Sequence, residues 1–254
     1  MNNLMEDAEF QESLRKEEEL SDYIAKGKKK EIHMYHPGNR HIYSKISRKL
    51  ESVLDRKYQK VLDVGCEFGD FLYLTNIGRE LYGIDISEER VKITRERLAE
   101  KGAVIEKGIA EQIPYNNGFF DLVIAQSTLH HCMYPDVVLQ EAGRVLKDNG
   151  TFVLIEGAND LWYRKAVHYF FEKFSRKYEA SQFDHHSKNK LEKLLTENNF
   201  EIKKEEDVSI PFAWIGRIGA GDKKLWTFFN NIDRSLPETF PWYHLFICEK
   251  NGTN

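Results

Sequence analysis

The sequence predicts a doubly wound α/β fold, in which helices cover both faces of a mostly parallel sheet. Two observations carry this prediction: short apolar, strand-like runs alternate with helix-like segments, and glycines follow the first of these runs. The seven predicted strands are residues 60–64, 80–85, 103–105, 120–125, 151–155, 200–210 and 243–249. In such folds the ligand binds where the carboxyl ends of the strands meet.

The first strand and the loop after it are the segment around which the chain is organised. Residues 61–64 are apolar except for Asp63 and include two β-branched valines, Gly65 and Gly69 break the strand, and an apolar run of helical length follows. This layout brings backbone N–H groups close to a ligand. A dinucleotide fingerprint needs three spaced glycines, but Glu67 and Asp70 occupy the second and third positions. Because two carboxylates repel a pyrophosphate, the loop favours a cationic ligand such as S-adenosylmethionine.

Helices are predicted between the early strands from apolar spacing and capping residues. A turn built on residues 37–39 precedes a helix that runs from Ile42 to about Asp55. Ser87 is a favourable N-cap for the next helix, which Gly102 ends. The inward-facing positions of that helix are Val91, Thr94 and Leu98.

The second half of the chain departs from this alternation and becomes rich in aromatic residues. All four tryptophans lie beyond residue 160. This half is predicted to contain four helices. The first covers residues 137–146 and is ended by residues 148–150, and the second is the aromatic segment 163–178. The third begins after its N-cap Ser187 and stops at Asn199, and the fourth covers residues 225–232. The large rings also suit an apolar acceptor pocket.

Length and composition limit the classes of protein. A chain of 254 residues suits one α/β domain with an elaboration, and its net charge of −4 gives no general attraction to nucleic acid or anionic membrane. Cys66, Cys132 and Cys248 form no paired motif, which favours a reducing, cytoplasmic setting and offers no metal cage. The acidic N-terminus lacks a signal-peptide pattern, and no apolar run approaches membrane-spanning length.

The chain is expected to divide into four segments. They are a helical leader at 1–42, a cofactor-binding core at 43–157, a helical cap on the acceptor side at 158–199, and strands that complete the sheet at 200–254. The leader is interpreted either as a lid over the ligand or as a solvated tail.

Four segments together resemble the class I S-adenosylmethionine-dependent methyltransferases, in the small-molecule branch that includes the quinone-biosynthesis enzymes. These segments are VLDVGCEFGDF at 61–71, LYGIDIS at 81–87, AEQIPYNNGFFDLVIAQSTLHH at 110–131 and EAGRVLKDNGTFVLIEG at 141–157. The resemblance implies a Rossmann-like sheet whose final strand is antiparallel. It also implies an enzyme that transfers a methyl group from S-adenosylmethionine to O, N or C of a small, apolar or aromatic acceptor.

The same resemblance implies which residues hold the cofactor. They are Gly65, Cys66, Glu67, Phe68 and Gly69 around the methionine part, Asp85 on the ribose hydroxyls, Ile86 and then Ala110 and Glu111 near the adenine, and Gln126 and Ser127 along the cleft. Two positions depart from the family pattern. Glu67 replaces a usual glycine, so that its carboxylate faces either the methionine ammonium or solvent. Ile109 replaces a common acid, so adenine recognition then depends on backbone groups or Glu111.

Methyl transfer needs alignment more than covalent work, because the leaving group is already good. Alignment contributes about 7–11 kcal/mol. A base is required only for a protonated, weakly acidic nucleophile. The candidates for that base are Tyr35, His36, His131 and His186. The alternative for the adjacent pair His130 and His131 is simple packing beside the cofactor, and no metal is expected.

Three other functions remain open from the residues. They are a non-catalytic module that binds S-adenosylmethionine, an RNA methyltransferase, which the acidic charge balance disfavours, and an NAD-dependent oxidoreductase, which the missing glycines disfavour. The expected partner is a small-molecule acceptor between segments 161–186 and 23–43, with no nucleic acid. The sequence identifies neither the acceptor nor the oligomeric state.

Overall fold

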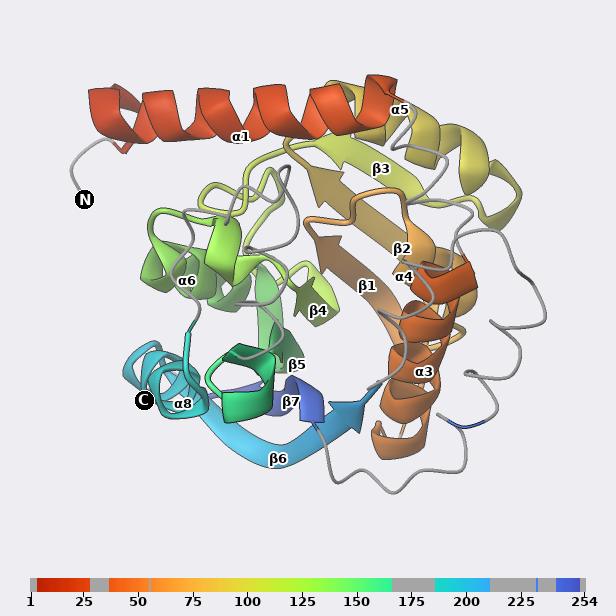
Figure 1. The fold of residues 1–254 in the computed structure, drawn as a ribbon, viewed down its shortest axis with the longest axis vertical. Coiled ribbons are helices and arrows are strands. Elements are labelled where there is room, and N and C mark those ends of the chain that lie inside the picture. The colour runs from red at the N-terminus through yellow and green to blue at the C-terminus, as the bar shows by residue number, and fades with distance from the viewer. Residues whose placement is uncertain are drawn as a thin grey trace.

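A seven-stranded sheet forms the centre of the computed structural model, which describes residues 4–27, 37–54, 56–165, 186–210, 232 and 241–251 (Figure 1). The strand order is β3-β2-β1-β4-β5-β7-β6. The strands are β1 (Tyr58–Val64), β2 (Gly78–Asp85), β3 (Val104–Lys107), β4 (Phe120–Gln126), β5 (Leu146–Gly157), β6 (Phe200–Ser209) and β7 (Pro241–Lys250). The first five strands pair in parallel, and β7 runs antiparallel to β5 and β6. The predicted fold class is therefore confirmed, including the antiparallel final strand.

Helices cover both faces of this sheet. They are α1 (Ala8–Lys26), α3 (Pro37–Val53), α4 (Asp70–Leu74), α5 (Glu88–Arg97), α6 (Pro135–Val145) and α8 (Lys188–Glu197), with short 3₁₀ turns η1 (Leu4–Glu6), η2 (Ala99–Lys101) and η3 (Leu129–His131). Apolar residues of α3, α4 and α5 form one core cluster, and those of α6 and α8 form another. Alternate residues of β4 divide between them: Leu122 and Ile124 join the first cluster, whereas Val123 and Ala125 join the second. This alternation is typical of a sheet buried on both faces.

The predicted helix caps are present. Ser87 Oγ accepts the Arg90 N–H at 3.1 Å, and Ser187 Oγ accepts the Lys190 N–H at 3.3 Å. Such caps each stabilise a helix by about 1 kcal/mol. Gly102 and Asn199 both have the left-handed backbone expected of a helix stop, with φ of 63° and 62°. Val91, Thr94 and Leu98 are fully buried, as predicted.

Two predicted boundaries are wrong. The turn predicted at 37–39 is instead the start of α3, because proline suits the first helical position, where no intrahelical N–H is needed. The helix predicted to reach 146 ends at Val145, and β5 already begins at Leu146, which pairs with Phe120. Residues 147–150 then form an irregularity opposite Asp121, with Asn149 in the left-handed region, so the expected turn lies inside the strand.

Some predictions fall outside the described residues. Of the aromatic helix predicted at 163–178, the structure describes only the beginning, and of 225–232 only Ile232. Tyr35 and His36 also lie outside. Among the helices that are described, none combines the length and apolar composition needed to cross a bilayer.

Candidate cofactor and acceptor site

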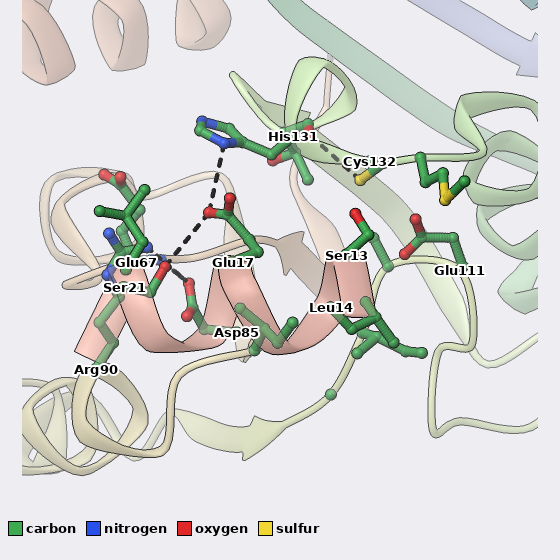
Figure 2. A pocket seen from close by; sticks show the side chains of 18 of the residues that line it. Ser13, Leu14, Glu17, Ser21, Glu67, Asp85, Arg90, Glu111, His131 and Cys132 are labelled. Carbon is green, nitrogen blue, oxygen red and sulfur yellow. Dashed lines mark hydrogen bonds and ion pairs between the residues drawn. The ribbon is translucent and has the colours of Figure 1, made fainter. Parts of the chain in front are cut away.

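A cavity of about 280 Å³ lies at the carboxyl ends of β1, β2 and β4 (Figure 2). Most of the residues predicted to hold the cofactor line it: Gly65, Glu67, Asp85, Ile86, Ala110, Glu111 and Ser127. The other predicted residues are not on its wall. Cys66 and Phe68 are buried, Gly69 stands at the N-terminus of α4, and Gln126 ends β4. The structure therefore places the glycine loop and the ends of β2 and β4 around one space.

Gly65 is required by the geometry of the loop. Its φ of +73° is a conformation that L-residues rarely adopt, and a Cβ added there would lie 2.7 Å from Thr128 Oγ1. Thr128 in turn donates its hydroxyl to the Val64 carbonyl at 2.8 Å, which fixes the neighbouring chain. The backbone can therefore approach a ligand closely at this point.

Asp85 both faces the cavity and holds the loop in place. One carboxylate oxygen accepts the Glu67 N–H at 2.9 Å, and the other accepts the Ser87 N–H at 2.9 Å. The Arg90 guanidinium lies 3.8 Å away. Burial raises the pKa of Asp85, and the charge of Arg90 partly offsets this rise. The acid that ends β2 is thus a structural support for the loop as well as a cavity residue.

Glu67 has a positive φ of 47°, which is unusual for a residue other than glycine. Thr94 Oγ1 donates to the Glu67 carbonyl at 2.8 Å, and the Tyr43 hydroxyl donates to the Glu67 carboxylate at 2.8 Å. These contacts hold the backbone and the side chain in a conformation that costs about 1–2 kcal/mol. Since Glu67 also lines the cavity, its negative charge lies beside the space for a ligand.

Helix α1 forms the roof of this cavity (Figure 2). Residues of one helical face line the space: Phe10, Ser13, Leu14, Glu17, Leu20, Ser21 and Ile24. Sequence reasoning assigned none of them to the cofactor. The available signal was their spacing of three and four residues, which marks one face of a helix, but the acidic residues between them suggested a solvated leader.

Polar and apolar contacts fasten α1 to the core on the two sides of the cavity. Asp22 pairs with the Ser87 hydroxyl at 2.5 Å, and Glu18 forms an ion pair with Lys107 at 2.5 Å. At the other end, Phe10 is fully buried and its ring lies 5.5 Å from that of Tyr134. The roof is therefore attached by a mixture of apolar burial and partly exposed charge.

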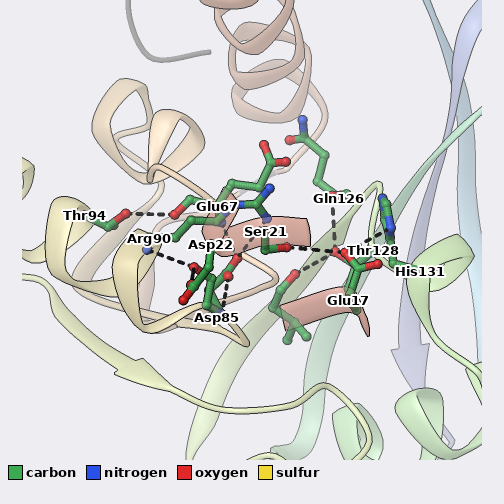
Figure 3. A network of polar contacts seen from close by, with 12 residues as sticks. Glu17, Ser21, Asp22, Glu67, Asp85, Arg90, Thr94, Gln126, Thr128 and His131 are labelled. Carbon is green, nitrogen blue, oxygen red and sulfur yellow. Dashed lines mark hydrogen bonds and ion pairs between the residues drawn. The ribbon is translucent and has the colours of Figure 1, made fainter. Parts of the chain in front are cut away.

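Glu17 lies at the centre of a polar network under the roof (Figure 3). Its carboxylate is 3.4 Å from His131 Nδ1 and accepts the Ser21 hydroxyl at 3.4 Å. Burial alone would raise the pKa of Glu17, but His131 and Arg90 outweigh it and lower that pKa. Burial raises the pKa of Glu111 on the opposite wall. The wall thus carries several carboxylates, balanced in part by Arg90.

A second cavity of about 500 Å³ adjoins the first, between α1, η3 and the start of α8. His130, His131 and His186 line it, and His131 lines both cavities. The structure thus brings the predicted catalytic candidates His131 and His186 to one space, whereas Tyr35 lies outside the described residues. His130, for which sequence reasoning favoured packing beside the cofactor, pairs with Glu156 at 2.8 Å. Within the described ranges, no group of three or more metal-ligating side chains is assembled.

Comparisons with known proteins agree with this geometry. Residues 62–154 match a family described as a methyltransferase domain. The ubiquinone/menaquinone biosynthesis C-methyltransferase UbiE of Paraburkholderia phytofirmans is 29% identical over 115 residues, which are 41% of this chain and 47% of the relative. UbiE of Cupriavidus metallidurans is 32% identical over 39% of this chain and 40% of the relative. The chain therefore aligns with less than half the length of these relatives.

Solved structures share the fold at low identity. The geranyl diphosphate C-methyltransferase of Streptomyces coelicolor, solved with S-adenosyl-L-homocysteine, has a TM-score of 0.59 at 15% identity, covering 82% of this chain and 79% of its own. The [4+2]-cyclase SpnF has a TM-score of 0.59 at 19% identity, covering 83% and 81%. Because these structures show only the fold, the assignment comes from the family match. The chain carries a class I S-adenosylmethionine-dependent methyltransferase domain.

Proposed function

We propose that this protein transfers the methyl group of S-adenosylmethionine to a small, apolar or aromatic acceptor. The observation that carries the proposal is that the glycine loop, Asp85 and the roof helix line one cavity at the carboxyl edge of the sheet. The family match over residues 62–154 includes the loop and the acid. S-adenosylmethionine supplies an activated methyl group, so the protein's work is binding, alignment and exclusion of water.

The cavity suits this cofactor at each of its chemical parts. Glycine at position 65 allows close approach of the backbone to the methionine portion. Asp85 is placed to accept hydrogen bonds from the ribose diol, and its oxygens retain lone pairs beyond the two backbone N–H groups. Ile86, Ile109 and Ala110 provide an apolar surface for the adenine.

The charge of the wall favours a cation. Glu17, Glu67, Asp85 and Glu111 line the cavity, with Arg90 as the permanently charged counterion. At an effective dielectric constant near 20, opposite unit charges 4 Å apart attract by about 4 kcal/mol. The excess of carboxylates attracts the sulfonium and ammonium groups of S-adenosylmethionine. The product S-adenosylhomocysteine lacks the sulfonium charge and is attracted less. The wall should therefore release the product more readily than the substrate.

We assign α1 the role of a lid over the cofactor. Its apolar and polar face completes the cavity, so movement of α1 away from the core would open a path for the cofactor. The acceptor then approaches from the second cavity, which shares Ser13, His131, Cys132 and Met133 with the first. The acceptor region predicted between segments 161–186 and 23–43 stays a prediction, because most of it lies outside the described residues.

Calorimetry and a turnover assay test this proposal. The purified protein should bind S-adenosylmethionine in a one-to-one complex and transfer its labelled methyl group to members of a panel of quinols, phenols, amines and enolisable ketones. Gly65→Val should abolish binding, because the side chain collides with Thr128 and resists the positive φ. The matched control is Gly102→Ala: its φ of +63° is similarly strained, but the space around it is open and remote from the cavity.

The alternative is a protein that binds the cofactor without methyl transfer. The cyclase with the same fold is the observation that keeps this alternative in view. Binding without turnover on any acceptor class would favour it. Absence of binding, in a wild-type protein that melts cooperatively, would refute both functions.

A further inference from the structure

Arg90 is a buried cation on the wall of the first cavity, and it has hydrogen-bonding capacity to spare. It lies in the first turn of α5, and only 9% of the residue is exposed. Its guanidinium is 3.8 Å from Asp85, beyond hydrogen-bond distance, and its buried Nε has no hydrogen-bond partner among the described residues. A guanidinium carries five N–H donors, and burial of a donor without an acceptor is unfavourable. The orphaned Nε therefore indicates that a ligand completes the contacts of this side chain.

The position of Arg90 is unfavourable for a cation in two ways. The N-terminal end of α5 favours negative charge, which suits Glu88 and Glu89 but not Arg90. Burial alone would also lower the pKa of Arg90, but the charges of Glu67, Asp85 and Glu17 outweigh it and raise that pKa. The guanidinium therefore stays charged because of the carboxylates around it, and not because of the helix that carries it.

Arg90 and Glu67 stand at one end of the cavity, whereas Glu111 stands at the other (Figures 2 and 3). With the adenine beside Ala110 and the ribose at Asp85, as proposed above, the methionine portion extends toward the end that Arg90 and Glu67 form. That portion ends in an α-amino acid, whose ammonium and carboxylate are attached to the same carbon. Its recognition requires an anionic and a cationic group close together.

This end of the cavity holds both kinds of charge. Glu67 and Glu17 line it with negative charge. Among the described residues that line the cavity, Arg90 is the only lysine or arginine. A planar guanidinium matches a carboxylate with two parallel N–H···O bonds, which a carboxylate-rich wall cannot provide.

We propose that Arg90 receives the carboxylate of the methionine portion, and that it makes the site specific for a cofactor with a complete amino acid. This inference rests on the proposed function and names a specificity-determining residue of the same site. The negative charges of Glu67 and Glu17 then lie beside the ammonium group. Arg90 selects the methyl donor and has no part in the choice of acceptor.

Two other roles of Arg90 would also weaken cofactor binding when the residue is replaced. The guanidinium could stack on the adenine ring, or it could serve only as the counterion of Asp85. The three roles differ in the part of the ligand on which the loss depends. Decarboxylated S-adenosylmethionine lacks only the carboxylate, and 5′-methylthioadenosine lacks the whole amino acid, so these two compounds are the probes.

Calorimetry on the full-length chain measures the coupling between Arg90 and the carboxylate. Arg90→Met keeps an unbranched, helix-forming side chain and removes the charge. Its affinity for S-adenosylmethionine should fall by about 10–100-fold, the loss expected for hydrogen bonds between charged groups. Its affinity for the decarboxylated compound should be unchanged or should rise, because that ligand carries two positive charges, no negative one, and is freed of a like charge.

Two further variants control the measurement. Arg90→Lys keeps the charge but not the planar fork, so its loss on S-adenosylmethionine should be smaller than that of Arg90→Met. It also replaces Arg90→Met as the test, through the ratio of the two affinities, if that variant does not melt cooperatively. Lys92→Met removes a cation from an exposed position of the same helix and should leave both affinities unchanged.

The outcomes separate this inference from the proposed function. Equal losses on S-adenosylmethionine and its decarboxylated form would overturn the carboxylate contact, and an equal loss on 5′-methylthioadenosine would assign the guanidinium to the adenosine portion. Variants that bind S-adenosylmethionine as tightly as the wild type would also overturn it. Both results leave the methyltransferase proposal standing. A wild-type protein that folds but binds no S-adenosylmethionine would overturn the proposed function itself.

Discussion

The contact between Gly65 and Thr128 gives a quantitative test of how the cofactor loop is built. In Gly65→Ala the new Cβ would meet Thr128 Oγ1 at 2.7 Å and Cγ2 at 3.0 Å, and the residue would keep a φ near +73°. The left-handed backbone costs about 1–2 kcal/mol for an L-residue. The collision adds about 1–3 kcal/mol, the usual cost of overpacking. The expected loss of stability is therefore about 2–5 kcal/mol.

A double-mutant cycle separates the two causes. Thr128→Ala alone loses the hydrogen bond to the Val64 carbonyl and should cost about 1 kcal/mol. In the Gly65→Ala background the same change also removes the colliding atoms, so it should be neutral or stabilising. The coupling should reach about 1–3 kcal/mol, and the strain from φ should persist.

Urea denaturation of the four proteins, followed by far-ultraviolet circular dichroism, measures this coupling. The slopes with denaturant must agree among the variants for the comparison to hold. Additive effects would refute the reasoning, because they would mean that Thr128 does not limit the space at Gly65. A fully restored double mutant would instead show that backbone strain contributes nothing.

Three further outcomes follow from the site. Asp85→Asn should weaken S-adenosylmethionine binding by about 1.5–3 kcal/mol, measured by calorimetry, and should also lower stability, because Asp85 is buried and accepts two backbone N–H groups. Deletion of residues 1–27 should weaken cofactor binding at least as strongly as it raises the acceptor KM, because α1 lines the cofactor cavity; unchanged affinity would contradict the lid. The pKa of Glu17 is lowered, so its contribution to α1 docking is present above its unfolded value near 4.5 and is lost as pH falls through the lower folded value. Hydrogen exchange of α1 should therefore accelerate relative to the core in acid, and Glu17→Gln should reduce that difference.

The sequence predicted the features that depend on neighbours along the chain. Alternating apolar runs identified all seven strands, and local capping chemistry identified Ser87, Ser187, Gly102 and Asn199. The end of β2 was predicted to carry an acid toward a ligand, and Asp85 does line the cavity. Such features need only the period of burial and the geometry of a turn.

The rest depended on contacts between distant segments. The charged residues of α1 suggested a fully solvated helix, although one of its faces lines the cavity. The other side of that cavity is formed by the ends of β1, β2 and β4, which are far from α1 in the sequence. His130 and Glu156 are 26 positions apart, and their hydrogen bond exists only because β4 and β5 are adjacent in the sheet. Pro37 was read as a turn residue because proline favours both turns and the first position of a helix. No local pattern distinguishes these cases.

The mixed attachment of α1 has a kinetic consequence. Its apolar anchor at Phe10 is insensitive to salt, whereas the ion pairs of Glu18 with Lys107 and of Lys26 with Glu89 are partly exposed and are screened by ions. If exchange of the cofactor for its product requires α1 to separate from the core, turnover cannot exceed the rate of that separation. Ionic strength then sets the speed of the catalytic cycle through a surface that never touches the reacting atoms. At low ionic strength the complex with the cofactor would be long-lived and turnover slow. At high ionic strength the complex would be short-lived and turnover fast.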